Sequence, residues 1–288
     1  MLRTVEGYTH VFTDYPSKPA HQMAGADERL AFGVLGPLKV TCAEGVPIGI
    51  PAGKQRIILA ALLLAANATV SGERLADALW DNGPPSTAAA AIRTYVMRLR
   101  HALGPAGRRL VSRPAGYAVE IRGPGELDLA ELHRLIGQSR HAAAAGDWSR
   151  AALLCQQALD LWRGAALEDI PSAALQGTEG EWLAELRTEI VTARIDAELN
   201  LGPTGHLITE LRQLAARYPL REHIQAQLML AYYRSGRQAD ALATYLSVTA
   251  KLATELGVEP GPELRRLHQG ILSGDPALSI PSQPLTCP

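Results

Sequence analysis

The sequence predicts a mainly helical protein with a small β part, divided into two domains. Its 288 residues suffice for about two domains of ordinary size. Strand-like runs, three helical runs and a second pair of strands occupy the first part, whereas helical periodicity with almost no strand signal follows. The charge divides in the same way: residues 1–125 hold 14 Lys and Arg against 9 Asp and Glu, and residues 126–288 hold 14 against 20. The basic N-terminal part favours a polyanionic partner.

The first domain is expected to open with short strands. Residues 1–28 are polar and lack a clear period, so we expect a disordered tail there. The string AFGVLGPLKVTCAEGVPIGI, which starts at Ala31, has β-type runs between Gly-Pro, Glu-Gly and Pro breaks. It predicts two or three strands in a small antiparallel sheet. The next string, RIILAALLLAANA, is apolar almost all round and predicts a buried helix that ends near Asn67.

Two further helices follow. Ser71, with Glu in the turn after it, predicts the N-cap of a helix. That helix should stop at Trp80, because the sequence DNGPP cannot continue it. Ser86 is expected to start a third, longer helix, which ends at Gly104.

A β-hairpin is expected to close the domain. Its strands are predicted at Leu110–Ser112 and Tyr117–Ile121, around a Pro-Ala-Gly turn. Sheet, three helices and hairpin together are the order of a winged helix-turn-helix with an added N-terminal sheet. We place this winged-helix DNA-binding domain at 29–123.

The second domain is predicted to be helical throughout. After a Gly-Pro-Gly linker we place it at 126–275, followed by a Pro/Ser-rich disordered tail at 276–288. Two strings, GDWSRA from Gly146 and GRQADA from Gly236, share the form Gly, four residues, Ala, and each lies between helical runs. This echo predicts tetratricopeptide-like helix pairs with degenerate repeats. The expected helices span about 127–145, 148–162, 179–200, 204–217, 221–235, 238–255 and 261–273.

The third helix has two contrasting faces. At 3.6 residues per turn, one face is apolar and is formed by Ile92, Val96, Leu99 and Leu103. The opposite face carries Ala90, Thr94, Met97, Arg98 and His101, with Arg93 and Arg100 on one shoulder and Tyr95 at the edge. A major groove admits such a helix, and Arg can bond there to guanine O6 and N7.

The hairpin extends the positive charge. Arg108, Arg109 and Arg113 lie beside or within it, and the stretch 86–123 holds seven Arg against one acid, Glu120. An Arg-rich helix face alone is more often simply solvated. Combined with the hairpin and the two preceding helices, it predicts DNA binding, with a hairpin arginine that reaches phosphates or the adjacent minor groove.

Other chemistries lack support in the sequence. Three distant cysteines, Cys42, Cys155 and Cys287, suggest neither a zinc site nor a disulfide framework, so no metal is expected and the setting is expected to be reduced and cytoplasmic. The string AGK before Gln55 lacks the earlier glycine and the Ser or Thr of a phosphate-binding loop. No GxSxG or HExxH string occurs, so we expect no catalytic residue and no cofactor. No apolar run has the length that a membrane span needs.

The motifs together resemble the Streptomyces antibiotic regulatory protein family of transcriptional activators. The strings that carry the resemblance are FGVLGPLKV, GKQRIILAALLLAANATVSGERLADALW, RTYVMRLRHALG, RPAGYAVEI, ALDLWRG, YPLREHIQAQLMLAYYRSGRQADALATY and LGVEPGPELRRLHQGIL. The resemblance implies a response-regulator-type winged helix followed by a bacterial transcriptional activator domain. It further implies an activator of a secondary-metabolite gene cluster that binds double-stranded promoter DNA at direct repeats, as a homodimeric pair, and recruits RNA polymerase holoenzyme.

The resemblance also assigns residues. Arg98 matches a base-contacting position, while Thr94, Tyr95 and Arg100 match positions that contact bases or backbone. Arg113, four residues before Tyr117 of the hairpin, matches a hairpin arginine. Asp81, Asn82, Gly83 and Ser86 match a loop that touches polymerase. Arg93 and Met97 depart from the residues that relatives often have, so the resemblance leaves the base preference open. The full set expected at DNA is Arg93, Thr94, Tyr95, Met97, Arg98, Arg100, His101, Arg113 and Tyr117.

Two competing interpretations remain. In one, the helical half is a protein-interaction scaffold and the winged helix is a docking module, which would not require the basic hairpin and helix face. In the other, the protein is an enzyme, which the absence of a catalytic constellation disfavours.

Overall fold

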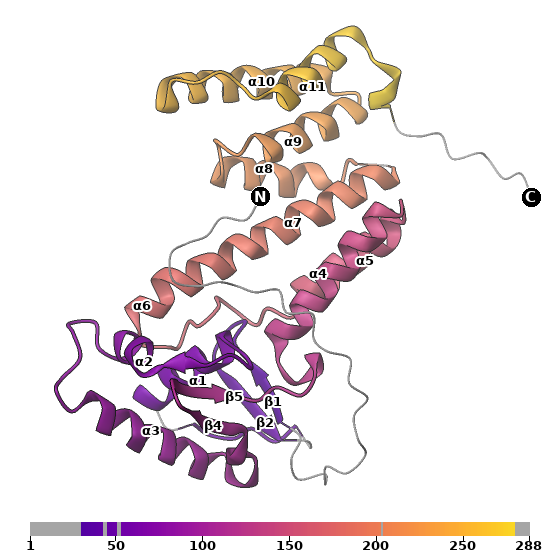
Figure 1. The fold of residues 1–288 in the computed structure, drawn as a ribbon. Coiled ribbons are helices and arrows are strands. Elements are labelled where there is room, and N and C mark those ends of the chain that lie inside the picture. Colours follow the sequence, from indigo (N-terminus) through magenta and orange to yellow (C-terminus); the bar gives the residue numbers. More distant parts are fainter. Residues whose placement is uncertain (1–29, 43–44, 51–52, 203, 280–288) are drawn as a thin grey trace, which may run out of the picture. The chain divides into compact units, whose positions relative to one another are not determined.

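The structure, a computed structural model, describes residues 30–42, 45–50, 53–202 and 204–279. The expected N-terminal tail and residues 280–288 of the expected C-terminal tail lie outside the described residues. The chain forms two compact units. The N-terminal unit comprises the chain up to Glu131 together with Leu167–Gly177, and the C-terminal unit comprises Leu132–Ala166 and the chain from Thr178 onward. The predicted fold class is confirmed: a winged-helix-like N-terminal region and a helical C-terminal region (Figure 1).

The N-terminal sheet is a hairpin of two strands, β1 (Leu30–Gly33) and β2 (Lys39–Cys42). The strands run antiparallel, and the side chains of Phe32 and Val40, which face each other in the register, are buried. Thr41 adds an isolated bridge to Pro47. This matches the expectation of two or three short strands.

Three helices form the body of the N-terminal unit, and each packs against the other two: α1 (Lys54–Leu64), α2 (Gly72–Leu79) and α3 (Ala88–Ala102). α1 is buried almost all round, as its apolar sequence predicts. Ser71 caps α2, because its Oγ accepts a hydrogen bond from Arg74 N at 3.2 Å. α3 begins at Ala88 rather than at Ser86. Ser86 and Thr87 instead form a turn, which is closed by the hydrogen bond from Ala88 N to Pro85 O at 2.9 Å.

The second sheet has three strands in the order β3-β5-β4. β4 (Leu110–Arg113) and β5 (Gly116–Val119) form the predicted hairpin, which we call the wing. β3 (Val70–Ser71) pairs with β5 and was not predicted, since two residues between helices show no periodicity. Gly116 permits this pairing, because a Cβ there would lie 2.0 Å from Val70 O.

The C-terminal unit is built from helices whose bounds fall within about one turn of those expected. α4 (Asp128–Ala144) begins in the N-terminal unit. α5 packs against α7, while α8, α9, α10 and α11 pack in succession around one apolar core (Figure 1). The other bounds are α5 (Trp148–Leu159), α7 (Glu181–Leu201), α8 (Leu207–Arg217), α9 (Glu222–Arg234), α10 (Gln238–Lys251) and α11 (Pro262–Ser273), with π-helical turns at Gln176–Gly180 and Leu252–Leu256.

The two glycines of the sequence echo end helices in the same way. Gly146 and Gly236 both have positive φ, at 76° and 73°. After α4, Asp147 N donates to Ala142 O at 2.9 Å, and after α9, Arg237 N donates to Tyr232 O at 2.9 Å. These are the hydrogen bonds of a Schellman cap, which requires a left-handed residue. The two strings therefore mark equivalent helix ends, after which the next helix begins: α5 after α4, and α10 after α9.

Two segments differ from the expected organisation. Residues 167–177, which we assigned to the helical domain, belong to the N-terminal unit and contain the short helix α6 (Ala173–Leu175). Residues 276–279, assigned to a disordered tail, instead include a 3₁₀ turn at Pro276–Leu278. Leu278 packs on the C-terminal core, and its carbonyl accepts a hydrogen bond from Arg234 Nε at 2.8 Å. Asp275 also caps the turn, because its carboxylate accepts a hydrogen bond from Ala277 N at 2.9 Å.

Candidate DNA-binding surface

α3 presents the two faces that its periodicity predicts. Ile92, Val96 and Leu99 are buried against the body of the N-terminal unit. On the other side Arg93, Met97, Arg98 and His101 are exposed, while Thr94 and Tyr95 are half-buried. The hydroxyl of Thr94 donates to Ala90 O at 3.1 Å, so its proton is used within the helix. The exposed surface of α3 thus combines cations with one long apolar side chain.

Arg93 and Arg98 have unpaired guanidinium groups. Neither guanidinium has a hydrogen-bond or ion-pair partner within the described part of the chain. Each therefore keeps its full set of five N–H donors for an external acceptor. A guanidinium in this state on an exposed helix face suits guanine O6 and N7 or a phosphate oxygen.

Arg100 is different, because its guanidinium is already attached to the wing. Nε donates to Leu110 O at 2.8 Å, and Nη2 donates to Ser112 Oγ at 2.9 Å. Two hydrogen bonds from one rigid group fix the last turn of α3 relative to β4. The side chain is half-buried and points away from the face that Arg98 occupies.

Arg109 is structural and does not add to the basic surface. It is 2% exposed and forms a two-point ion pair with Glu126, at 2.7 Å from Nη1 and 3.1 Å from Nη2. Glu126 also accepts from the backbone N of Arg122 at 2.8 Å. Counting charges along the hairpin therefore overstated its positive surface.

The wing arginine, Arg113, is exposed but is held by the neighbouring loop. Its Nη1 donates to Asn67 O and to Thr69 Oγ1, both at 3.2 Å. Asn67 in turn bonds through its side chain to the backbone N and O of Ile121, at 2.8 and 3.0 Å. Tyr117 is half-buried on β5, opposite Ser112. These contacts hold Arg113 in a defined position on the wing. The sequence analysis missed the role of Asn67, because it interpreted that residue only as the end of a helix.

The loop between α2 and α3 is exposed throughout Asp81, Asn82, Gly83 and Ser86. Its starting point is anchored, because the last carbonyls of α2 are occupied. Lys54 Nζ donates to Leu79 O, and Ser172 Oγ donates to Ala78 O. Carbonyls at a helix end otherwise lack partners, so these contacts cap α2 immediately before the loop.

Comparison with known proteins identifies the family. Residues 51–119 match the family described as transcriptional regulatory protein, C terminal, and residues 127–272 match the bacterial transcriptional activator domain. Regulatory protein DnrI of Streptomyces peucetius is 35% identical over 254 residues, which cover 85% of this chain and 93% of DnrI. The chain belongs to the Streptomyces antibiotic regulatory protein family of transcriptional activators.

Other relatives are longer than this chain. Regulatory protein AfsR of Streptomyces coelicolor is 45% identical over 250 residues, which are 87% of this chain but 25% of AfsR. The solved structure of Mycobacterium tuberculosis EmbR in complex with a low affinity phosphopeptide superposes with a TM-score of 0.80 at 38% identity. That match covers 88% of this chain and 66% of EmbR.

In this member of the antibiotic regulatory protein family, the segment 167–177 is fastened to the N-terminal unit by polar contacts that sequence reasoning missed. Leu38 N donates to Asp169 Oδ1 at 2.8 Å, and Arg56 forms an ion pair with the same carboxylate. Leu38 lies in the loop between β1 and β2, and Asp128 binds the start of that loop, because its carboxylate accepts from the backbone N–H groups of Val34 and Leu35. No local signal distinguishes these carboxylates from surface acids, because their partners lie more than 90 residues away.

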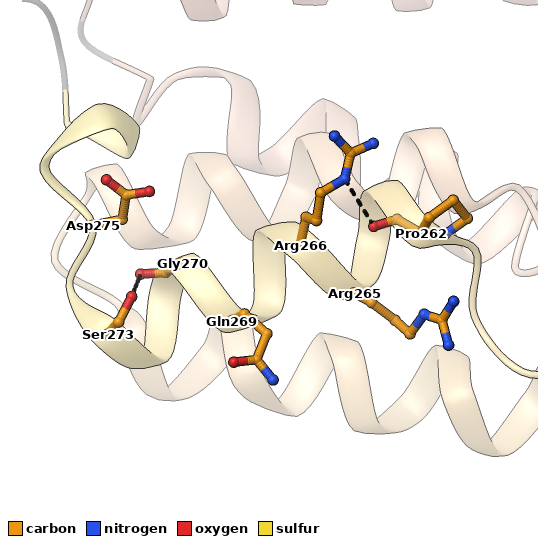
Figure 2. A pocket seen from close by; sticks show the side chains of 7 residues that line it. All are labelled: Pro262, Arg265, Arg266, Gln269, Gly270, Ser273 and Asp275. Atoms are coloured by element: carbon orange, nitrogen blue, oxygen red, sulfur yellow. Dashed lines mark hydrogen bonds between the residues drawn. The ribbon is translucent and has the colours of Figure 1, made fainter.

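The C-terminal unit of this family member has a shallow hollow on α11 (Figure 2). Its polar lining residues bond locally: Arg266 Nε donates to Pro262 O, and Ser273 Oγ donates to Gly270 O, both at 3.3 Å. The lining contains neither a histidine nor a cysteine. Elsewhere in the described ranges no group of His, Cys, Asp and Glu is arranged to hold a metal, and no helix is long and apolar enough to cross a membrane.

Proposed function

We propose that this chain is a sequence-specific DNA-binding activator that places α3 in the major groove of promoter DNA. The observation that carries the proposal is that two arginines on the exposed face of α3, Arg93 and Arg98, are unpaired within the described residues. The fixed wing beside the helix supports it, because Arg113 extends the positive surface toward a neighbouring phosphate or minor groove. Arg98 is assigned to a base and Arg93 to the phosphate backbone.

The proposal includes binding to direct repeats by two protomers. A single winged helix buries about 600–1,000 Å² of protein surface on DNA, which is small for strong specificity. Two protomers held on adjacent repeats raise the effective concentration of the second site. The regulated promoters are proposed to belong to a secondary-metabolite gene cluster, in keeping with the family.

Recruitment of RNA polymerase is assigned to the loop Asp81–Ser86. The loop is exposed, and the capping contacts at Ala78 and Leu79 fix the end of α2 just before it. A loop that is both accessible and anchored loses little conformational entropy when a partner binds. The proposal therefore separates two surfaces, α3 and the wing for DNA and the α2–α3 loop for polymerase.

The test starts with the full chain and random double-stranded DNA. Repeated selection should enrich one sequence that occurs as a direct repeat, and footprinting should show both copies protected. Polymerase run-off assays on a promoter that carries the repeat should then show activation. If no sequence is enriched, the DNA-binding proposal is wrong and the winged helix is better explained as a docking module. If Asp81→Ala and Ser86→Ala together leave activation unchanged, the assignment of the loop is wrong.

A further inference from the structure

The exposed face of α3 carries one large apolar side chain, Met97, which is 61% exposed. Arg98 adjoins it in sequence, and Arg93 and His101 lie one turn before and after it. Within the described residues of the N-terminal unit, the other strongly exposed large apolar side chain is Val46, which follows β2. Isolated apolar side chains are common on protein surfaces. Met97 is distinguished by its place at the centre of a cationic surface.

The side chains around Met97 indicate which kind of base contact it could make. Thr94 uses its hydroxyl proton on Ala90 O, and the run Ala88–Ala91 contributes only methyl groups to the start of the helix. Arg98 supplies strong donors, which suit guanine. A side chain without donors or strong acceptors can add base selectivity in a major groove mainly through the C5-methyl group of thymine.

The geometry places this contact beside the one made by Arg98. Met97 and Arg98 both lie on the exposed face of α3, and successive residues rise only about 1.5 Å along a helix axis, which is less than the roughly 3.4 Å between base pairs along one strand. Neighbouring side chains on a helix in the groove therefore address the same or adjacent base pairs. Methionine is unbranched and has a polarizable thioether, so it can adapt to a methyl group whose position is set by the DNA.

We infer that Met97 reads the C5-methyl group of a thymine adjacent to the guanine bound by Arg98. The inference rests on the proposed function and adds a base to the expected operator. Thymine selectivity at that position would arise from burial of the methyl group against the Met97 side chain.

The test compares thymine with deoxyuridine, which lacks the C5-methyl group. The probe is the duplex selected by the full chain, with each thymine replaced in turn. At one position, next to a guanine whose selectivity Arg98→Ala abolishes, the wild type should lose affinity by roughly three- to five-fold, the equivalent of one buried methyl group. Met97→Ala should bind the thymine duplex correspondingly more weakly and should no longer distinguish thymine from deoxyuridine there.

Val46→Ala is the matched control, because it also removes an exposed apolar side chain from the N-terminal unit. It should retain the full sensitivity to deoxyuridine, and circular dichroism should show that both variants are folded. If Met97→Ala keeps the wild-type penalty, or if no thymine matters to the wild type, the inference is overturned. Failure of the proposed function would be seen earlier and separately, since the selection would then enrich no sequence.

Discussion

Several arginines of the C-terminal unit are paired with carboxylates, whereas two exposed arginines of α3 have no such partner among the described residues. In the C-terminal unit Arg194 pairs with Glu198 and Glu210, and Arg221 and Arg237 also pair with carboxylates. On α3, Arg93 and Arg98 have no such partner among the residues that the structure describes. Arg212 of α8 is likewise exposed and unpaired within the described ranges, so an unpaired arginine alone does not mark a DNA-binding surface; α3 differs because it carries two of them, Arg93 and Arg98, on one exposed face.

The same contrast exists within the basic stretch 86–123. Arg109 belongs to a buried pair, Arg100 holds the wing, and Arg113 is tied to the loop at Asn67. The stretch therefore mixes cations that maintain the surface with cations that can bind.

The largest effect is expected where a structural cation loses its partner. Glu126→Ala leaves Arg109 buried without its carboxylate, and removing one member of a buried pair costs about 3–5 kcal/mol. Denaturant unfolding should show this loss in the transition of the N-terminal unit. Glu259→Ala removes an exposed carboxylate from its pair with Arg265 and should cost less than about 1 kcal/mol. Similar losses of stability from both changes would contradict the distinction between the buried pair and the exposed pair.

An intermediate effect is expected at Arg100. If its role is to hold the wing, Arg100→Lys should weaken DNA binding almost as much as Arg100→Ala, by about 1–2 kcal/mol, because an ammonium group cannot make the same two-point contact. Ser112→Ala, which changes no charge, should cause part of the same loss in gel-shift titrations. Full activity of Arg100→Lys would instead indicate a simple charge contact with phosphate.

The smallest effect is expected from an exposed pair of the C-terminal unit. The hydrogen bond from His223 to Asp196 raises the pKa of His223 above its ordinary value, with burial acting in the opposite direction. Because the folded pKa is the higher one, the stabilisation is complete below about pH 6.5 and disappears as the pH rises through the raised value. Thermal unfolding of the wild type and His223→Ala should therefore differ slightly in acid and converge in base. A difference that grows with pH would contradict this sign.

Particular residues show what sequence reasoning could predict. The faces of α3 and the Ser71 cap depend on neighbours within a few residues, so periodicity and local sequence predict them. The echo at Gly146 and Gly236 predicted helix pairs but not the glycine caps that end their first helices. The exposed and buried positions of the candidate DNA-binding residues follow from the same periodicity. Their roles at DNA stay predictions.

Other features depend on distant partners and could not be predicted. Strand β3 exists because Gly116 brings β5 against Val70, and the segment 167–177 joins the N-terminal unit through Asp169 and Ser172. Likewise, the sequence shows the arginines of the stretch 86–123 but does not show which partners their guanidinium groups bind. Nothing in the local pattern separates Arg109, which is paired and buried, from Arg98, which is exposed and unpaired.

The most direct test of the account is the specificity of Arg98. Arg98→Ala should lose about 1–3 kcal/mol on the selected operator and much less on random DNA, because a base contact is removed. Arg212→Ala is the matched control, since Arg212 is exposed on α8 and also has no partner in the described ranges. Both variants would be titrated on operator and random duplexes at the same salt concentration. The account predicts that Arg98→Ala reduces the difference in binding free energy between operator and random DNA, and that Arg212→Ala leaves this difference unchanged. An equal difference in the two variants would contradict the account.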